Sequence, residues 1–381
     1  MKLALAFAFT LAVSACGGGS EPAENSATPD SGTAIDCAKA APYSKPGPFV
    51  PAVTTVTIDG VVTEVWYPAD KGAEAGKKKD IYDMRNWLPE ADRSKIPDSD
   101  TPLYETNAYR DIAISKSGKY PIVLFSHGLG GYRLQSSFLM THLASWGFVV
   151  AAPDHVERGL ALVLAGDLSK IEDKATDQLK AALAWLESEN GKAGSRFQGL
   201  LDLSHVAATG HSMGGAAVST LIDDAKISSA TLLASGGFGE TPPGKSMMML
   251  WGTADRVAKP SSLQTAFDKQ PKGARSIGVN LAGHMAFTDL CVVGRDRGGV
   301  LQIAKDHGIK VEDLVVTLAS DGCGTQPGGA AYLSPEDGWP VIDHYVTAQI
   351  RSAFGIDKAP IGLDDAAKSC FGDRVAASIT K

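Results

Sequence analysis

One stretch of sequence decides the fold of this chain: His205-Val206-Ala207-Ala208-Thr209-Gly210-His211-Ser212-Met213-Gly214, followed by Gly215-Ala216-Ala217-Val218. The apolar run at 205–209 predicts a short strand, and the small residues after Gly214 are compatible with a helix. The five residues between them match G-x-S-x-G, a pattern in which a strand turns sharply into a helix and exposes a serine at the turn. Since the chain has 41 glycines, the pattern alone is weak, and the flanking strand and helix make it specific.

Strands and helices alternate on both sides of this stretch. Apolar runs predict strands at 122–125, 148–152, 232–233, 247–251 and 277–281. Helical spacing of apolar residues predicts helices at 134–146 and 175–189 and a closing helix at 341–354. The alternation predicts an α/β protein with a mostly parallel central sheet and helices on both faces.

The chain before residue 120 and after residue 291 is less regular. Two β-branched runs, 54–58 and 61–67, flank Asp59-Gly60, which predicts an antiparallel hairpin. Residues 71–119, the first insertion, are polar and proline-interrupted, so we expect no core element there. We place them on the rim of the site around Ser212. Residues 292–333, the second insertion, could lean over the same site. About a dozen residues separate 234 from 247, which leaves no room for a large cap after the sixth strand and predicts that the site is open from that side.

Composition limits the classes of protein that this chain can be. With 381 residues, 44% hydrophobic and 21% charged, it is globular, which excludes wholesale disorder, a collagen-like repeat and a coiled coil. The formal net charge of -7 argues against nucleic-acid binding, which needs a concentrated positive face.

The serine of the turn needs a base and an acid to become a nucleophile. His284 follows the strand at 277–281, and Asp255 follows the strand at 247–251, so both lie where the carboxyl ends of parallel strands meet. Along the chain, Ser212, Asp255 and His284 follow the order serine, acid, histidine, which accompanies the G-x-S-x-G turn in hydrolases that use a serine nucleophile. Asp154 and Asp289 are the rival acids, for which we expect a solvated surface role instead.

The other histidines have different expected roles. His127 precedes a glycine-rich loop and is expected to support it, and His211, next to the serine, is expected to pack or hydrogen-bond. His205 begins a strand, and His142 and His344 lie in predicted helices.

An oxyanion formed during acyl transfer needs two backbone N–H donors. Met213, directly after the serine, would supply one. The second is expected from Leu129 in Ser126-His127-Gly128-Leu129-Gly130-Gly131, where glycines allow close backbone approach; a tight glycine turn alone is the alternative.

The N-terminus has the pattern of an export signal. Lys2 precedes an apolar run from Leu3 to Val13, so residues 1–15 are expected to be a removed signal peptide. Val13-Ser14-Ala15-Cys16 resembles the bacterial lipobox, which implies that Cys16 is lipidated; a plain signal peptide with a stray cysteine is the alternative. By the same resemblance, Gly17 implies the outer membrane. Residues 16–36 then form a flexible tether, and residues 37–381 a single domain.

Four cysteines remain in a chain that is expected to lie in an oxidising compartment. Cys37, Cys291, Cys323 and Cys370 can pair in three ways; we favour Cys291 with Cys323 and Cys37 with Cys370, because the second bridge would join both ends of the domain. A metal site is disfavoured, since no cysteine has a CxxC spacing or a nearby histidine.

The residues placed so far resemble known hydrolases. The segments 119–133 and 143–148, together with 210–215, resemble the platelet-activating-factor acetylhydrolase group of secreted α/β-hydrolases, a similarity that covers roughly 120–290. Asp255-Arg256-Val257-Ala258-Lys259-Pro260 also resembles bacterial cutinases and polyester hydrolases. Dienelactone hydrolases resemble the fold but use a cysteine where this chain has Ser212.

These resemblances imply a lipid-anchored serine carboxylic-ester hydrolase that forms an acyl-enzyme and needs no metal or organic cofactor. Short-acyl esters and phospholipid esters are the expected substrates. A cutinase-like polyester hydrolase is the alternative, and an amidase or peptidase or a non-catalytic binding lipoprotein comes after it.

Overall fold

Six parallel strands form the centre of the sheet in the computed structural model, which describes residues 35–166, 168–237 and 239–381. The signal peptide, Cys16 and nearly all of the tether expected above lie outside these residues. In space the parallel strands run β10, β9, β8, β7, β5, β6. Their bounds are β5 (Tyr120–Ser126), β6 (Val149–Pro153), β7 (Leu201–His211), β8 (Ile227–Leu233), β9 (Ser246–Gly252) and β10 (Arg275–Val279).

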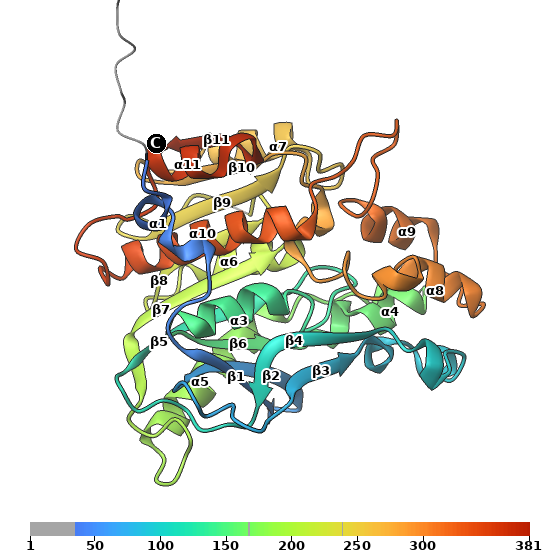
Figure 1. Ribbon diagram of the computed structural model, residues 1–381, viewed down its shortest axis with the longest axis horizontal. Coiled ribbons are helices and arrows are strands. Elements are labelled where there is room, and N and C mark those ends of the chain that lie inside the picture. Colours follow the sequence, from blue (N-terminus) through green and yellow to red (C-terminus); the bar gives the residue numbers. More distant parts are fainter. Residues whose placement is uncertain (1–34, 167, 238) are drawn as a thin grey trace, which may run out of the picture. The chain divides into compact units, whose positions relative to one another are not determined.

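Helices cover both faces of this sheet, as the alternation predicted (Figure 1). Side chains of a strand alternate between faces, so Val123 and Phe125 pack in one hydrophobic cluster and Ile122 and Leu124 in another. The first cluster contains α3 (Ser137–Ser145) and α10 (Pro335–Ala353). The second contains α5 (Ala175–Gly191), α6 (Met213–Leu221) and α7 (Pro260–Phe267). Burial on both sides explains why these strands are continuously apolar in sequence.

The predicted hairpin is confirmed. β1 (Val50–Ile58) pairs antiparallel with β2 (Val61–Ala69), and Asp59 and Gly60 both have positive φ, 49° and 84°. Two central residues with positive φ match the twist of the flanking strands. β2 in turn pairs antiparallel with β6, which attaches the hairpin to the parallel strands.

The first insertion does contribute to the sheet, so the expectation of no core element there is wrong. β3 (Lys79–Asp83) pairs antiparallel with β4 (Leu103–Arg110), and β4 pairs in parallel with β1. In β4 only Thr106 and Ala108 are buried. β4 lies between β1 and β3 near one end of the sheet, and a strand covered on one face only needs few apolar residues, so its sequence looked irregular.

The C-terminal part is also longer in structure than predicted. After α10, expected to close the chain, follow α11 (Asp365–Phe371) and β11 (Val375–Thr380), which pairs antiparallel with β10. The second insertion contains α8 (Val300–Asp306) and α9 (Asp313–Ser320), on the right in Figure 1. The remaining short elements are α1 (Cys37–Ala40), η1 (Pro42–Ser44), η2 (Met84–Trp87), α2 (Glu90–Arg93), η3 (Asp98–Asp100), η4 (Val156–Arg158), α4 (Leu160–Leu164), η5 (Leu168–Lys170), η6 (His284–Phe287), η7 (Arg295–Arg297) and η8 (Gly372–Arg374).

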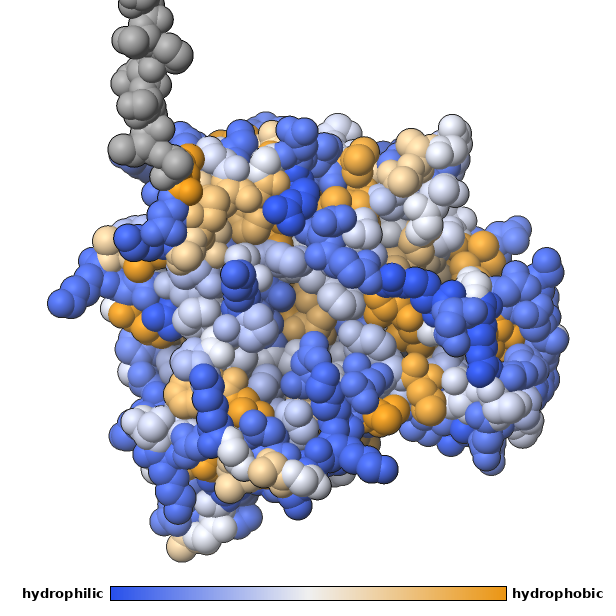
Figure 2. Space-filling model, in the orientation of Figure 1, coloured by the Kyte–Doolittle hydropathy of each residue, from blue (hydrophilic) through white to orange (hydrophobic). Residues whose placement is uncertain are grey.

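The surface seen in the same orientation is mostly hydrophilic, with separate hydrophobic patches (Figure 2). Several large apolar side chains are exposed on the two insertions, among them Ile81, Leu103, Leu314 and Val316. Within the described part of the chain, no helix has the length and apolar character needed to cross a bilayer.

Both favoured disulfides are confirmed. Cys37 pairs with Cys370 and joins α1 to α11, and Cys291 pairs with Cys323 and closes the loop that carries α8 and α9. The two bridges differ tenfold in span, 333 against 32 residues.

Removing the long-range bridge is expected to destabilise the fold more than removing the short-range one. In the chain-entropy treatment, the difference between loops of 333 and 32 residues is about 2 kcal/mol, and losing either bridge costs about 2–5 kcal/mol. Guanidinium unfolding of the Cys37→Ser/Cys370→Ser and Cys291→Ser/Cys323→Ser chains measures this order. Equal or reversed losses of unfolding free energy would contradict the entropic explanation.

Candidate active site

Ser212 stands in a strained turn between β7 and α6. Its φ is 55° and its ψ is -120°, a backbone conformation that residues other than glycine rarely adopt. The two glycines of the pattern are needed because other backbone atoms pack directly against them. A Cβ on Gly210 would lie 2.2 Å from the Gly214 carbonyl oxygen, and one on Gly214 would lie 1.9 Å from the Ser126 oxygen.

His284 and Asp255 meet at the carboxyl ends of β10 and β9. The distance from His284 Nδ1 to Asp255 Oδ2 is 3.0 Å, and both side chains are buried. The other carboxylate oxygen of Asp255 accepts from the backbone N–H groups of Val257 (2.9 Å) and Ala258 (2.7 Å), which fixes its orientation. A histidine that donates from Nδ1 to a carboxylate keeps Nε2 as a proton acceptor.

The structure brings Ser212 and His284 together at one cavity. Both line it, and so do Leu129 and Met213, the two residues expected to hold an oxyanion. A Cβ on Gly128 would lie only 3.0 Å from the Ser212 Cβ, so the loop before Leu129 passes directly beside the serine. Met213 begins α6, and the first N–H groups of a helix have no partner within it. The arrangement can therefore offer backbone N–H groups to negative charge that develops at a carbonyl bound next to Ser212.

Two buried side chains hold the glycine-rich loop. His127 bonds to the Gly128 oxygen through Nδ1 (2.8 Å) and accepts from the His155 N–H at Nε2 (2.9 Å), which is the supporting role expected for it. Arg158 donates to the His127 oxygen (2.7 Å) and to the Ser126 hydroxyl (2.9 Å). Burial lowers the pKa of Arg158 to about 10, so it stays charged at neutral pH beneath this loop.

His211 supports His284 instead of acting on the serine. Its Nε2 donates to the His284 carbonyl oxygen (3.0 Å), and its Nδ1 accepts from the Gln135 amide (3.1 Å). Burial lowers the pKa of His211 to about 3, so the ring is neutral. With both nitrogens engaged, His211 has no free position for proton transfer.

The expectation that Asp154 and Asp289 are solvated is wrong, because both are buried. Asp154 accepts from Trp87 Nε1 (2.7 Å) and Arg133 Nη1 (2.8 Å). Asp289 accepts from the Ser137 and Phe138 N–H groups at the start of α3. Each carboxyl is satisfied by partners distant in sequence, and adjacent residues could not reveal this.

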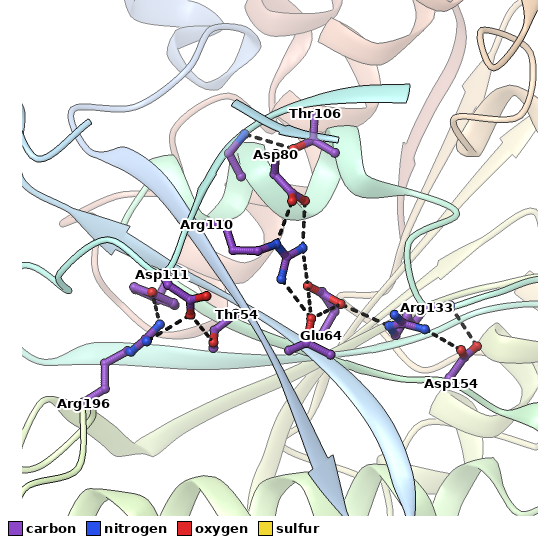
Figure 3. A network of polar contacts seen from close by, with 12 residues as sticks. Thr54, Glu64, Asp80, Thr106, Arg110, Asp111, Arg133, Asp154 and Arg196 are labelled. Atoms are coloured by element: carbon purple, nitrogen blue, oxygen red, sulfur yellow. Dashed lines mark hydrogen bonds and ion pairs between the residues drawn. The ribbon is translucent and has the colours of Figure 1, made fainter. Parts of the chain in front are cut away.

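A buried network that sequence reasoning missed links the first insertion to the site (Figure 3). Glu64 on β2 is fully buried and accepts from Arg110 Nη2 (3.0 Å) and Arg133 Nε (3.1 Å). Arg110 also pairs with Asp80 of β3, and Arg133, four residues after Leu129, also pairs with Asp154. A glutamate inside the apolar run 61–67 was the one signal in the sequence, since an unpaired charge is not buried.

The cavity beside Ser212 has a volume of about 310 Å³ and is mainly apolar. Residues 234–237 and 239–245, between β8 and β9, form no helix. These residues therefore form no large cap on that side, as expected. Other parts of the cavity are lined by both insertions: Met84, Leu88, Ile96 and Pro102 from the first and Val300, Leu301, Ile303, Ala304, Ile309, Val311, Val315, Leu318 and Ala319 from the second. Among the described residues, no cluster of three or more His, Cys, Asp or Glu side chains is arranged to hold a metal ion.

Five buried histidines make the fold sensitive to acid. Burial lowers the pKa of His127, His142 and His211 to about 3, that of His344 to about 4 and that of His155 well below its usual range. Below pH 6.5 the unfolded chain binds protons at these positions and the folded chain does not. Each histidine therefore reduces the stability by about 1.4 kcal/mol for each pH unit down to its folded pKa.

Two buried carboxyl groups act in the opposite direction. Burial raises the pKa of Asp289 to about 7 and that of Asp343 well above its usual range, so between pH 4 and 6.5 the folded chain holds protons that the unfolded chain lacks. Five histidines against two carboxyl groups leave a net loss of about 4 kcal/mol for each pH unit on acidification. Guanidinium midpoints at pH 7 and pH 5 measure this, and a midpoint that is unchanged or higher at pH 5 would contradict it.

Part of the chain is similar to known proteins. Residues 59–195 match the family model described as platelet-activating factor acetylhydrolase, isoform II. The chain is similar to the platelet-activating factor acetylhydrolase of Cavia porcellus (33% identity; 28% of this chain, 33% of the relative) and to a putative phospholipase A2 of Schizosaccharomyces pombe (32% identity; 28% and 23%). It is also similar to the Bos taurus acetylhydrolase (54% identity; 10% and 8%). The chain spans a third or less of the length of these relatives. The family match includes Leu129 and ends before Ser212.

Proposed function

We propose that this chain, whose fold is that of an α/β-hydrolase and which is similar to the platelet-activating factor acetylhydrolases, is a serine carboxylic-ester hydrolase. The observation that carries the proposal is the pairing of His284 with Asp255 at the cavity into which the strained Ser212 turn also opens. These are the parts that acyl transfer requires: a nucleophile, a base and an acid that orients the base.

The reaction proceeds in two halves. His284 Nε2 takes the proton of the Ser212 hydroxyl as Oγ attacks the ester carbonyl carbon, and the Leu129 and Met213 N–H groups stabilise the oxyanion. Collapse of this intermediate breaks the bond to the alcohol oxygen, which takes the proton from His284. Water, deprotonated by His284, then attacks the acyl-enzyme, and the acid is released as the proton returns to Ser212. Asp255 keeps the ring of His284 in the required tautomer throughout.

The names of the relatives suggest the first substrates to test, acetyl and other short-acyl esters and phospholipid esters. The test is hydrolysis of p-nitrophenyl esters from acetyl to palmitoyl by the full chain in detergent, beside its Ser212→Ala variant. Hydrolysis that the variant lacks supports the proposal. A folded chain that cleaves no ester, or a variant as active as the parent, would overturn it.

We also propose that the chain is exported and anchored through a lipid on Cys16, with residues 16–36 as a tether for the domain at 37–381. The lipobox-like sequence supports this, and so do the two disulfides, which persist in oxidising compartments. In a bacterial host, metabolic labelling with palmitate is expected to tag the chain and to fail for Cys16→Ala. Equal labelling of both chains would contradict the anchor.

A further inference from the structure

The cavity extends from the catalytic residues to a hydrophobic cluster of its own. Ser212, His284 and Leu129 line it in one part. Ile96, Ile303 and Ile309 line it in another, and these three isoleucines form a cluster separate from the two main cores of the protein. The cavity therefore joins the reacting centre to a region that the central fold does not need for its own packing.

The two insertions meet at this cluster. Ile96 belongs to the first insertion, and Ile303 and Ile309 belong to the second. Outside the cluster, Asp100 forms an ion pair with Arg297 Nη1 (2.9 Å) and contacts His307 Nε2 (3.1 Å), so polar contacts also join the insertions. The Cys291–Cys323 bridge closes the base of the second insertion. Three kinds of contact thus hold a wall whose inner surface faces the cavity.

The lining of the cavity determines which chemistry it accepts. Among the described residues, no Asp, Glu, Lys or Arg lines it, and its few polar groups, such as Gln135 and Thr288, do not come from the insertions. Burying a charged group there would leave it without a partner. An uncharged aliphatic chain has no hydrogen bonds to water to give up, and each CH₂ that it buries raises its affinity about fourfold.

The volume limits the length of such a chain. A cavity of about 150 Å³ holds benzene, with six carbons. By proportion, the 310 Å³ beside Ser212 accommodates roughly twelve carbons. An acetyl group alone would leave most of this space unfilled.

We infer that the cavity binds one uncharged aliphatic chain of about eight to twelve carbons of the ester substrate, and that the second insertion sets its length. The inference rests on the proposed ester hydrolase and adds the substrate class. The chain can belong to the acyl group or to the alcohol, and the two cases share the same recognition chemistry.

Ala304 is the position that tests this most sharply. It lies on α8, lines the cavity and packs against the isoleucine cluster, so Ala304→Phe fills the space near that cluster. Ala161→Phe is the matched control, since Ala161 is exposed on α4, whose Leu160, Val163 and Leu164 line the same cavity. Val311→Ala, which enlarges the cavity, is a second variant with the opposite expected effect.

Two series of esters separate the acyl and alcohol cases: p-nitrophenyl esters with acyl chains of two to sixteen carbons, and alkyl acetates with alcohols of four to twelve carbons. In one series, Ala304→Phe is expected to lower kcat/KM for the ten-carbon chain relative to the four-carbon chain at least tenfold, because it excludes two or more methylenes and each buried methylene is worth about fourfold. Val311→Ala is expected to move the optimum to longer chains. The series that responds identifies the arm of the ester that the cavity holds.

Binding of 1-decanol to the Ser212→Ala chain tests the cavity without catalysis. Calorimetry is expected to show binding that weakens at least tenfold when Ala304→Phe is added and is unchanged with Ala161→Phe. If decanol binding depends on Ala304 but the parent chain, with Ser212 intact, hydrolyses no ester, the proposed function fails and the cavity assignment stands. Chain-length profiles and decanol binding that are the same in all folded variants would overturn the inference itself.

Discussion

Replacing Ser212 with alanine is expected to lower kcat for ester hydrolysis by at least about 10⁴-fold, because the acyl-enzyme cannot form without Oγ. The loss should leave the fold intact, since alanine removes only the hydroxyl. Progress curves with p-nitrophenyl butyrate, run beside thermal unfolding of both chains, measure the two quantities.

His284 and Asp255 form the catalytic triad with Ser212, and substitutions of these two residues test whether the three act together. His284→Ala is expected to lose about as much activity as Ser212→Ala, and the double variant no more than either, since the residues act as a unit. Asp255→Asn is expected to lose about 10⁴-fold, because an amide cannot hold the required tautomer of His284.

Ser235→Ala is the matched control for the serine. Ser235 lies next to the turn, since a Cβ placed on Gly215 would be 2.5 Å from the Cβ of Ser235. Ser235 does not line the cavity. The Ser235→Ala chain is expected to keep the activity of the parent.

If the losses of activity in Ser212→Ala and His284→Ala were independent and added up in the double variant, the mechanism would be contradicted.

Gly214→Ala is expected to destabilise the chain by more than about 4 kcal/mol, the range of exceptional single substitutions. Its new Cβ would lie 1.9 Å from the Ser126 oxygen, which belongs to β5 at the centre of the sheet and cannot move away cheaply. Soluble yield and the guanidinium midpoint measure the loss.

Gly191→Ala controls for the loss of a glycine as such. Gly191 ends α5, and a Cβ there would meet no atom within 4 Å. That substitution is expected to leave stability unchanged or to raise it by up to about 1 kcal/mol. Similar midpoints for Gly214→Ala and the parent would mean that the strained turn is not needed by the fold.

Much of this architecture could be predicted from local pattern. The parallel strands are continuously apolar because both faces are covered, and the Asp59-Gly60 turn and the Ser212 turn follow from backbone conformations that few sequences allow. Asp255 and His284 could be selected because they directly follow predicted strands.

The rest depended on contacts between distant residues. Glu64 and Asp154 are buried because Arg133 and Arg110 reach them from other elements, and no local pattern shows such a pairing. The last two strands at one end of the sheet, β4 and β3, bury few residues each, so their polar sequences did not predict strands. Ile96 and Ile303 line the same cavity from two insertions separated by about 200 residues, and no local pattern shows that these two side chains meet.

The most direct test of the central claim is covalent labelling of the nucleophile. The full chain is treated with a fluorophosphonate probe, digested and analysed by mass spectrometry, with Ser212→Ala and Ser235→Ala treated in parallel. The mechanism predicts one modified peptide, with the added mass on Ser212, in the parent and in Ser235→Ala and none in Ser212→Ala. A folded chain that carries no label, or label that persists in Ser212→Ala, would show that Ser212 is not an activated nucleophile.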